Sequence, residues 1–239
     1  MTVRRLLIID CETTGLSPVM DSVIEVAVIL YDVEHATVRS AYSSLLRCHH
    51  NPAEPINRIS PAAIVNADDG TATWRFVESI AGNAQAIVAH NAEFDRAFVP
   101  PSLRTCLPWI CSKDDIRWPK QTREGASLVS LALEHDLGVA VVHRAMADCD
   151  LIARLFTRAR ELGADLDAML VRAMRPKGEF VALVSYDDRD KAKAAGFRWD
   201  AETKQWWRRM AIEDAAVLPF HTAPALPRVA VVPNKGGWT

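Results

Sequence analysis

The sequence predicts an α/β fold with a small α+β module at its C-terminal end. Three runs with strand character come before any long helical pattern, which favours an antiparallel opening to the sheet. Apolar strands and helical segments then alternate as far as residue 174, and the composition changes after that point. The chain has 239 residues, 49% of them hydrophobic, which is enough for one α/β domain with its own core and a small appendage.

The first strand carries the feature around which the rest of the chain is organised. Residues 6–9 are a continuous apolar run, as in a strand buried on both faces, and Asp10 and Glu12 follow it. Residues two apart on an extended chain point to the same side, so both carboxylates face whatever lies over the end of the strand. Like charges repel unless a cation lies between them, and hard oxygen ligands favour Mg²⁺ or Mn²⁺. Taken alone, such a pair is more often two solvated acids.

Two further strands are expected at residues 23–31 and 37–48, so that three consecutive strands can pair antiparallel. Residues 51–69 are rich in Pro, Asn and Asp and form a loop over the sheet. Within this loop, residues 60–65 form one helical turn that a serine caps and a proline begins. Glu25 interrupts the apolar second strand, and we favour a supporting structural role for it over a role as a ligand.

A second acidic position follows the next strand. Residues 71–83 have apolar side chains at helical spacing, and residues 84–89 form an apolar strand. The chain is already helical after this strand, so Asp95 projects from the first turns of a helix over the sheet. The prolines at positions 100 and 101 are expected to stop that helix.

The third acidic position lies on the most regular helix of the chain. A short strand at residues 109–111 and a serine-capped helix at residues 127–135 precede it. Residues 145–162 carry an apolar stripe at helical spacing, with Asp148 near the start. A further short helix is expected at residues 165–174.

The C-terminal part has its own pattern. The expected divisions are a main domain at residues 1–174, a linker at 175–178, a small strand–helix–hairpin module at 179–212 and a Pro-rich flexible tail at 213–239. The module has a strand at residues 180–185, a helix at 187–195 capped by Asp187, and a hairpin across residues 201–204.

The net charge and the cysteine content bear on the cellular compartment and on general charge attraction, and they do not indicate a specific function. The formal net charge of −2 gives no general attraction for polyanions, so nucleic-acid binding needs a local basic patch or metal ions. Five scattered cysteines, odd in number, indicate reduced thiols. The sequence shows no targeting segment and no apolar run long enough for a membrane, so we expect a cytoplasmic protein.

Three stretches together resemble a known family. Residues 9–16 (IDCETTGL), 90–95 (HNAEFD) and 143–148 (HRAMAD) resemble, in order and content, the three motifs of the DnaQ-like 3′→5′ exonucleases. The H-x-A-x-x-D pattern that begins at His143 is that of the DEDDh subgroup. The resemblance covers about residues 1–165, and residues 56–60, 109–111 and 118–119 are most similar to exodeoxyribonuclease X. It implies a ribonuclease H-like mixed sheet whose first three strands are antiparallel and which helices flank.

The resemblance also implies a set of catalytic roles. Two divalent cations, Mg²⁺ or Mn²⁺, would be bridged by Asp10, with Glu12 and Asp148 at the first ion and Asp95 acting through water at the second. His143 would take the proton from the attacking water, for which an imidazole pKa of about 6.5 is suited. Substrate contacts are implied for a further group of residues, namely Thr13, Thr14, Leu16, His90, Asn91 and Phe94.

Each of the five catalytic residues also has an ordinary structural explanation. The acids fit turn formers or helix-start charges, Asp148 fits an ion pair with Arg144 or Arg154, and His143 fits a loop histidine. These explanations hold singly, but their coincidence at five matched positions has a probability of less than about one in a hundred.

The hairpin of the module offers a second contact with nucleic acid. Alternation places Trp206 and Trp207 on opposite faces, so one of them is left exposed near Arg208 or Arg209 as a stacking platform for single strands. Packing of this tryptophan against the main domain is an equally good interpretation. The segment resembles small modules appended to some exonuclease X-like proteins, and this resemblance assigns it no role.

The sequence therefore predicts a metal-dependent 3′→5′ exonuclease that acts on DNA, preferably at single-stranded 3′ ends, releases nucleoside 5′-monophosphates and takes part in DNA repair. An RNA-trimming exonuclease and a polymerase-associated proofreading subunit share the same catalytic residues and stay open. A nucleic-acid-binding protein without catalysis is the alternative of a different class. It would be expected to lack a ligand, and none is missing.

Overall fold

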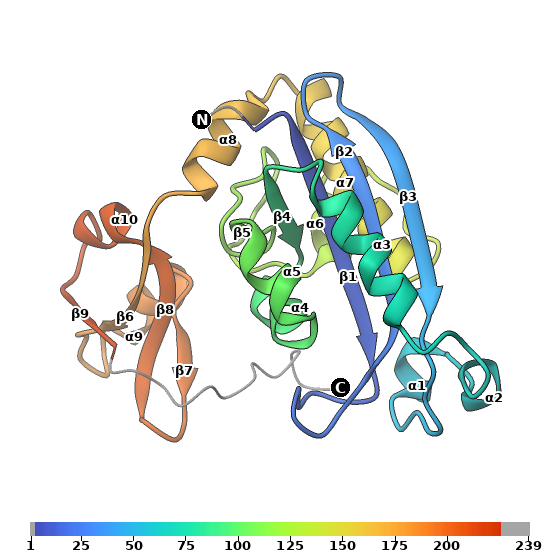
Figure 1. The fold of residues 1–239 in the computed structure, drawn as a ribbon. Coiled ribbons are helices and arrows are strands. Elements are labelled where there is room, and N and C mark those ends of the chain that lie inside the picture. The colour runs from blue at the N-terminus through green and yellow to red at the C-terminus, as the bar shows by residue number, and fades with distance from the viewer. Residues whose placement is uncertain (1–2, 226–239) are drawn as a thin grey trace.

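The computed structural model describes residues 3–225 and contains two sheets with their helices (Figure 1). The strands of the larger sheet are β1 (Arg5–Thr13), β2 (Val23–Asp32), β3 (Thr37–Leu45), β4 (Ala86–Ala89) and β5 (Trp109–Cys111). The helices around it are α1 (Glu54–Asn57), α2 (Pro61–Ile64), α3 (Thr71–Ala81), α4 (Ala92–Phe98), α5 (Pro101–Cys106), α6 (Leu128–Glu134), α7 (Ala145–Glu161) and α8 (Leu166–Ala173). We call this part the nuclease domain.

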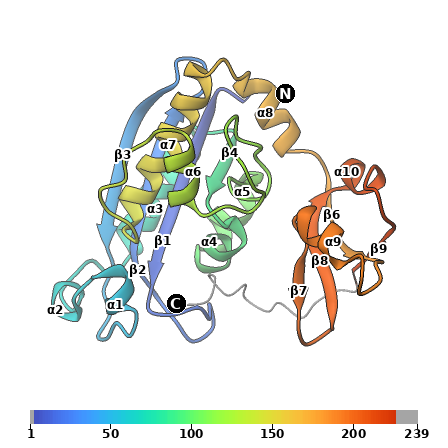
Figure 2. The ribbon, with the colours of Figure 1, turned by 180° about the vertical axis from the view of Figure 1, so that it is seen from behind.

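The larger sheet is mixed, as predicted. Its order is β3-β2-β1-β4-β5, in which β1, β2 and β3 pair antiparallel and β4 and β5 run parallel to β1. Helices cover both faces: α3, α4 and α5 lie on one side (Figure 1), and α6 and α7 lie on the other (Figure 2). Leu7 and Ile9 pack toward the first group of helices, and Leu6 and Ile8 pack toward the second. Asp10 and Glu12 continue the alternation of Leu6 and Ile8, so they face α7.

The two acids of β1 lie within the strand rather than beyond its end, which corrects the sequence prediction. The partner strand β2 is long enough to pair with them, since Asp10 lies opposite Ala27 and Glu12 opposite Glu25. Pairing therefore continues to Thr13, where a register shift ends the regular ladder. The carboxylates are thus carried by rigid, hydrogen-bonded backbone.

Most expected helices are present, with local differences. Ser60 caps α2 and Ser127 caps α6, as predicted. The expectation for the two prolines was incomplete, because Pro101 also begins a new helix, α5, in which its fixed φ suits the first position. The short helix α1 was not anticipated. The helix α6 ends at Glu134, and Asp136 with φ 61° turns the chain before Gly138.

The smaller sheet differs more from expectation. We call residues 177–225 the C-terminal module; its elements are β6 (Lys177–Ala182), α9 (Arg189–Ala194), β7 (Arg198–Asp200), β8 (Gln205–Ala211), α10 (Ile212–Ala216) and β9 (Thr222–Pro224). Its strand order is β7-β8-β6-β9. The expected hairpin is present as β7 and β8.

Three expectations for this part were wrong, two on element boundaries and one on a helix cap. Lys177 and Gly178, expected in a linker, belong to β6, and part of the expected tail forms α10 and β9. The remaining tail, residues 226–239, lies outside the described residues. Asp187 does not cap α9, whose N-cap is Asp188 without a side-chain cap bond. Among residues 3–225, no helix has both the length and the hydrophobicity that a membrane span requires.

Candidate active site

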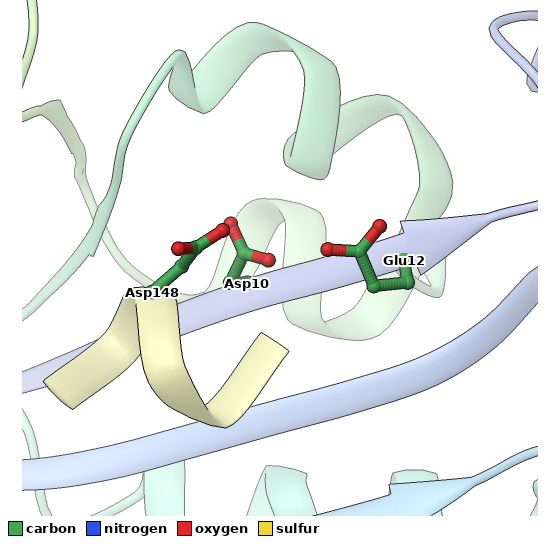
Figure 3. A group of neighbouring side chains, drawn as sticks. All are labelled: Asp10, Glu12 and Asp148. Carbon is green, nitrogen blue, oxygen red and sulfur yellow. The ribbon is translucent and has the colours of Figure 1, made fainter. Parts of the chain in front are cut away.

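Three carboxylates from two distant segments come together over the sheet. Asp10 and Glu12 point to the same side of β1, and Asp148 reaches them from the start of α7 (Figure 3). Each offers one oxygen such that all three oxygens lie within 4.8 Å of one another. Asp10 and Glu12 are buried, and Asp148 is half-buried. Such a cluster of hard oxygen donors suits a divalent cation, because a positive ion offsets the repulsion among them.

The fourth acid is held next to the same strand. The strand β4 ends at Ala89, and Asn91 with φ 73° turns the chain into α4. Asp95 is 1% exposed, and its Oδ1 accepts a hydrogen bond of 3.0 Å from the backbone N–H of Cys11. Cys11 lies between Asp10 and Glu12. The second motif is therefore attached to the middle of the first.

A buried thiol confirms that the three motifs share one environment. Burial raises the pKa of the Cys149 thiol well above its usual value, and the negative charges of Asp10, Asp95 and Asp148 raise it further. These charges come from β1, α4 and α7, and all of them act on one side chain. The acids predicted from separate motifs thus converge in space.

The histidine predicted as the base lies on the approach to α7. His143 is exposed and has φ 58°, a left-handed conformation that is uncommon for a residue with a side chain. The next residue, Arg144, is the N-cap of the helix that carries Asp148. His143 and Asp148 are therefore fixed by the same helix start.

The two arginines proposed as ordinary partners of Asp148 contact other acids. Arg144 binds Glu25 through two hydrogen bonds, and Arg154 lies 3.7 Å from Asp150. This leaves the Asp148 carboxylate directed at Asp10 (Figure 3). Both arginines are thus engaged with acids other than Asp148.

The loop after β1 is held rigidly. The Thr13 hydroxyl donates to the Gly15 carbonyl at 2.6 Å, and the Thr14 hydroxyl donates to Asp21 at 3.1 Å. A Cβ at Gly15 would lie 2.5 Å from the Asp21 carboxylate, so a side chain there would displace Asp21 from its contacts with the loop. Leu16 is half-buried on the same loop.

The other predicted substrate residues surround α4. His90 Nδ1 lies 2.9 Å from the Ser112 hydroxyl, and Asn91 provides the turn into the helix. Phe94 is 1% exposed and packs against Phe98 with ring centroids 4.9 Å apart. Phe94 therefore supports the wall of the site from within.

The two arginines of the hairpin that were predicted to contact single strands bind acids instead. Arg208 pairs with Glu124 at 2.5 Å, and Arg209 lies 3.7 Å from Glu93 and 3.8 Å from Asp115. Both arginines thus face the nuclease domain instead of being available beside an exposed tryptophan.

The tryptophans of the hairpin lie on its two faces. Trp206 and Trp207 are both half-buried, and Trp206 packs on the small core of the module. The exposed member of the hairpin is Trp199, which lies opposite Trp206 with ring centroids 5.6 Å apart and is 52% exposed. Neither Trp206 nor Trp207 is fully exposed, so the expectation of an exposed tryptophan at one of these two positions is not met, and the exposed tryptophan of the hairpin is Trp199 on the edge strand β7.

A family model described as "Exonuclease" matches residues 7–156. The chain belongs to this family, as a DnaQ-like 3′→5′ exonuclease. A second model, of a domain of unknown function (DUF8626), matches residues 178–225, which is nearly the whole C-terminal module.

Relatives agree with this assignment. DNA polymerase III subunit epsilon of Treponema pallidum is 30% identical over 164 residues, which cover 62% of this chain and 73% of that protein. Exonuclease X in complex with 5′-overhanging duplex DNA matches with 27% identity and a TM-score of 0.53, over 70% of this chain and 99% of that one. Exonuclease I of E. coli with a dT13 oligonucleotide shares the fold, at 18% identity and a TM-score of 0.56, over 80% of this chain and 50% of that one. The exonuclease is thus a hydrolase of nucleic acids with a ribonuclease H-like fold.

Sequence reasoning missed two groups near the site. Arg144 was weighed only as a partner of Asp148, and Asp21 was not singled out. A single acid in an apolar strand, Glu25, was the available signal for the first group. No signal pointed to the second, because the Asp21 contacts arise from the path of the loop.

Proposed function

We propose that the exonuclease removes nucleotides from the 3′ end of DNA, prefers single-stranded ends and releases nucleoside 5′-monophosphates. The observation that carries this proposal is the convergence of Asp10, Glu12 and Asp148 within 4.8 Å, with Asp95 bound to the same strand. The solved exonuclease X complex contains DNA, and this chain spans nearly all of that protein. DNA is therefore the preferred substrate class.

The donor set fits a pair of divalent cations. Asp10, Glu12 and Asp148 would hold them, and Asp95 beside the same strand would contribute as well. Mg²⁺ or Mn²⁺, when bound, supplies positive charge to the scissile phosphate and its leaving oxygen and acidifies the attacking water. The carboxylates themselves bring together negative charge that a bound cation would neutralise.

His143 would act as the general base. Its imidazole would accept the proton of the attacking water at a ring nitrogen, which an ordinary imidazole pKa of about 6.5 permits near neutral pH. The side chain is exposed and lies on the loop before α7, so it can approach the site when substrate binds.

The terminal nucleotide would lie against two walls. The loop with Thr13, Thr14 and Leu16 forms one wall, and its internal hydrogen bonds fix the backbone that faces the substrate. His90 and Asn91, supported by the buried Phe94, form the other. Rigid groups on two sides would orient the 3′ end for attack.

The C-terminal module would contact the single strand upstream of the 3′ end. Trp206, with Trp199 beside it, provides aromatic surface on which bases can stack. Trp207, Arg208 and Arg209 would contribute less, because the two arginines are engaged with acids of the nuclease domain. We also propose that residues 177–225 form a separate folding unit.

A proofreading role is the second candidate. The DNA polymerase III epsilon relative, which this chain covers to 73%, favours a polymerase as partner. RNA trimming uses the same chemistry and differs from the proposed DNA exonuclease activity only in its substrate. For such roles, as for DNA repair, we expect the enzyme to act in the cytoplasm.

End-labelled substrates test the proposal. Single- and double-stranded DNA and RNA, labelled at the 5′ end, are digested with Mg²⁺, Mn²⁺ or EDTA, and the products are resolved by length. We expect stepwise shortening from the 3′ end, fastest for single-stranded DNA, and no digestion in EDTA. Faster digestion of RNA, or digestion that persists in EDTA, would contradict the proposal.

A further inference from the structure

A buried carboxylate that belongs to none of the three motifs lies beside the cluster. Glu25 is 3% exposed and lies directly opposite Glu12 in the ladder between β1 and β2. Opposite residues of an antiparallel pair share a face, with Cβ atoms about 4.5–5.5 Å apart, and like charges at such positions destabilise the sheet. Glu25 therefore adds a negative charge where the site already gathers several, and its environment must offset that charge.

The start of α7 supplies the groups that offset it. Arg144 donates from Nε to Oε2 of Glu25 at 3.0 Å and from Nη2 to Oε1 at 2.8 Å, a two-pronged contact between guanidinium and carboxylate. The backbone N–H of Ala145 donates to the same Oε2 at 3.0 Å. Three charge-assisted hydrogen bonds thus connect β2 to the first residues of α7.

This contact also replaces a missing helix cap. The N-cap of α7 is Arg144, whose side chain caps nothing locally, so the first N–H groups of the helix need an acceptor. Glu25 provides it from 120 residues away in the sequence, at the helix end where a negative charge is favourable. The first turn of α7 is therefore tied to the sheet, in register with the acids of β1.

The residues predicted to act in the reaction lie on both sides of the contact. His143 directly precedes Arg144 and has φ 58°, a conformation that surrounding contacts must maintain. The backbone N–H of Asp148 donates to the Arg144 carbonyl at 3.1 Å, which is the first hydrogen bond of the helix. A shift of Arg144 would therefore move both His143 and Asp148.

The guanidinium also acts on the charge of the site. Its hydrogen bonds with Glu25 raise the pKa of Arg144, and the charges of Glu25 and Glu12 raise it further. Because Arg144 occupies both oxygens of Glu25, that carboxylate cannot compete with Glu12 for a cation. The ion pair with Arg144 thus gives Glu25 a structural role and leaves Glu12 as the acid available to a cation.

We propose that Glu25 and Arg144 are positioning residues of the exonuclease, whose ion pair holds His143 and Asp148 in place against the acids of β1. This inference rests on the proposed roles of those two residues. Neither member of the pair needs to touch the substrate, since both act through the start of α7. A merely structural pair would instead affect only the stability of the fold.

Matched substitutions test the pair. Arg144→Met and Glu25→Gln are compared with Arg154→Met and Asp150→Asn, which alter an exposed ion pair on the same helix. The measurements are kcat and KM on 5′-labelled single-stranded DNA, Mn²⁺ affinity by calorimetry, and the thermal unfolding midpoint. For the Glu25 and Arg144 variants, we expect kcat and Mn²⁺ affinity each to fall about 10- to 100-fold, with KM nearly unchanged. The controls should match the wild-type enzyme.

Two further variants separate positioning from folding. The double substitution of Glu25 and Arg144 should lose no more kcat than the worse single variant, because the pair acts as one unit. Arg144→Lys keeps the charge but not the two-pronged geometry, so it should restore part of the lost kcat. If Arg144→Met does not fold, the kcat of Arg144→Lys still tests whether the pair positions His143 and Asp148.

The results that overturn the inference are distinct from those that overturn the function. Variants that unfold at lower temperature, yet keep wild-type kcat and Mn²⁺ affinity while folded, would show that the pair is only structural. A wild-type enzyme and controls that leave DNA intact would instead refute the DNA exonuclease proposal, whatever the Mn²⁺ affinities of the variants.

Discussion

The nuclease domain and the C-terminal module are stabilised by different interactions. In the nuclease domain, residues 6–9 of β1 are fully buried between two layers of helices. The module has a small core around Phe197 and Met210, and it contacts the nuclease domain through ion pairs such as that of Lys177 with Asp115. The acids of β1 are thus fixed by apolar packing of their strand, whereas the position of the module depends on charge.

The largest effect is expected within the buried part. Asp10→Ala should lower kcat about 1,000-fold or more, because removal of the bridging carboxylate forfeits several kcal/mol of transition-state stabilisation. The fold should persist, since the change relieves repulsion among the acids. Digestion rates and circular dichroism measure the two effects. Asp150→Asn, an exposed acid on α7, is the control, and equal activity of the two variants would refute the assignment.

The contact between the two parts contains one buried ion pair. The side chains of Lys177 and Asp115 are 9% and 2% exposed, so Lys177→Met removes the near cation of a buried carboxylate and leaves it the longer contact of 3.8 Å with Arg209. We expect a loss of about 3 kcal/mol in the free energy of unfolding. Lys120→Met, which alters the exposed pair with Asp136, should cost less than about 1 kcal/mol in the same denaturant titration. Equal losses would show that the contact is not specially stabilised.

Removal of most of the module should affect binding more than chemistry. Deletion of residues 180–239 keeps Lys177 beside Asp115 but removes the hairpin with its aromatic surface. The KM for single-stranded DNA should rise about tenfold, and kcat at saturating substrate should change little. A long and a short oligonucleotide distinguish the cause, since only the longer one can reach the module. If KM is unchanged on both, the hairpin has a packing role alone.

The smallest effect is expected at one exposed side chain. Trp199→Ala should weaken single-strand binding by about 1–2 kcal/mol, because one stacking surface is lost while the ion pairs of the module remain. Val217→Ala, also exposed and in the module, serves as the control. Fluorescence titration with an oligonucleotide longer than the active site can hold measures the difference. Equal affinities of the two variants would contradict the proposed stacking of bases on Trp199.

The sequence predicted the nuclease domain well because its signals are local. Apolar runs defined β1, β2 and β4, and helix periodicity with a serine cap defined α6. The acids were found because they stand next to these elements. Their convergence could be inferred only from the family resemblance, since no local pattern states which strand ends lie side by side.

The features that the sequence did not predict depend on distant partners. The contact of Arg144 with Glu25 joins residues 119 positions apart, and Arg209 approaches Glu93 only after the two sheets have been placed. The strand β9 was missed because Pro224 argues against a central strand. Proline is tolerated there because β9 lies at the edge of its sheet, where among residues 3–225 it pairs with β6 alone.

Binding of Mn²⁺ to the substrate-free enzyme, measured by calorimetry, tests the central claim most directly. Asp10→Ala and Asp148→Asn change acids 138 positions apart that share one cluster, whereas Asp150→Asn changes a solvent-exposed acid of the same helix. We predict that either of the first two substitutions abolishes measurable binding and that the third leaves it unchanged. Mn²⁺ bound with equal affinity by all three variants would contradict the account.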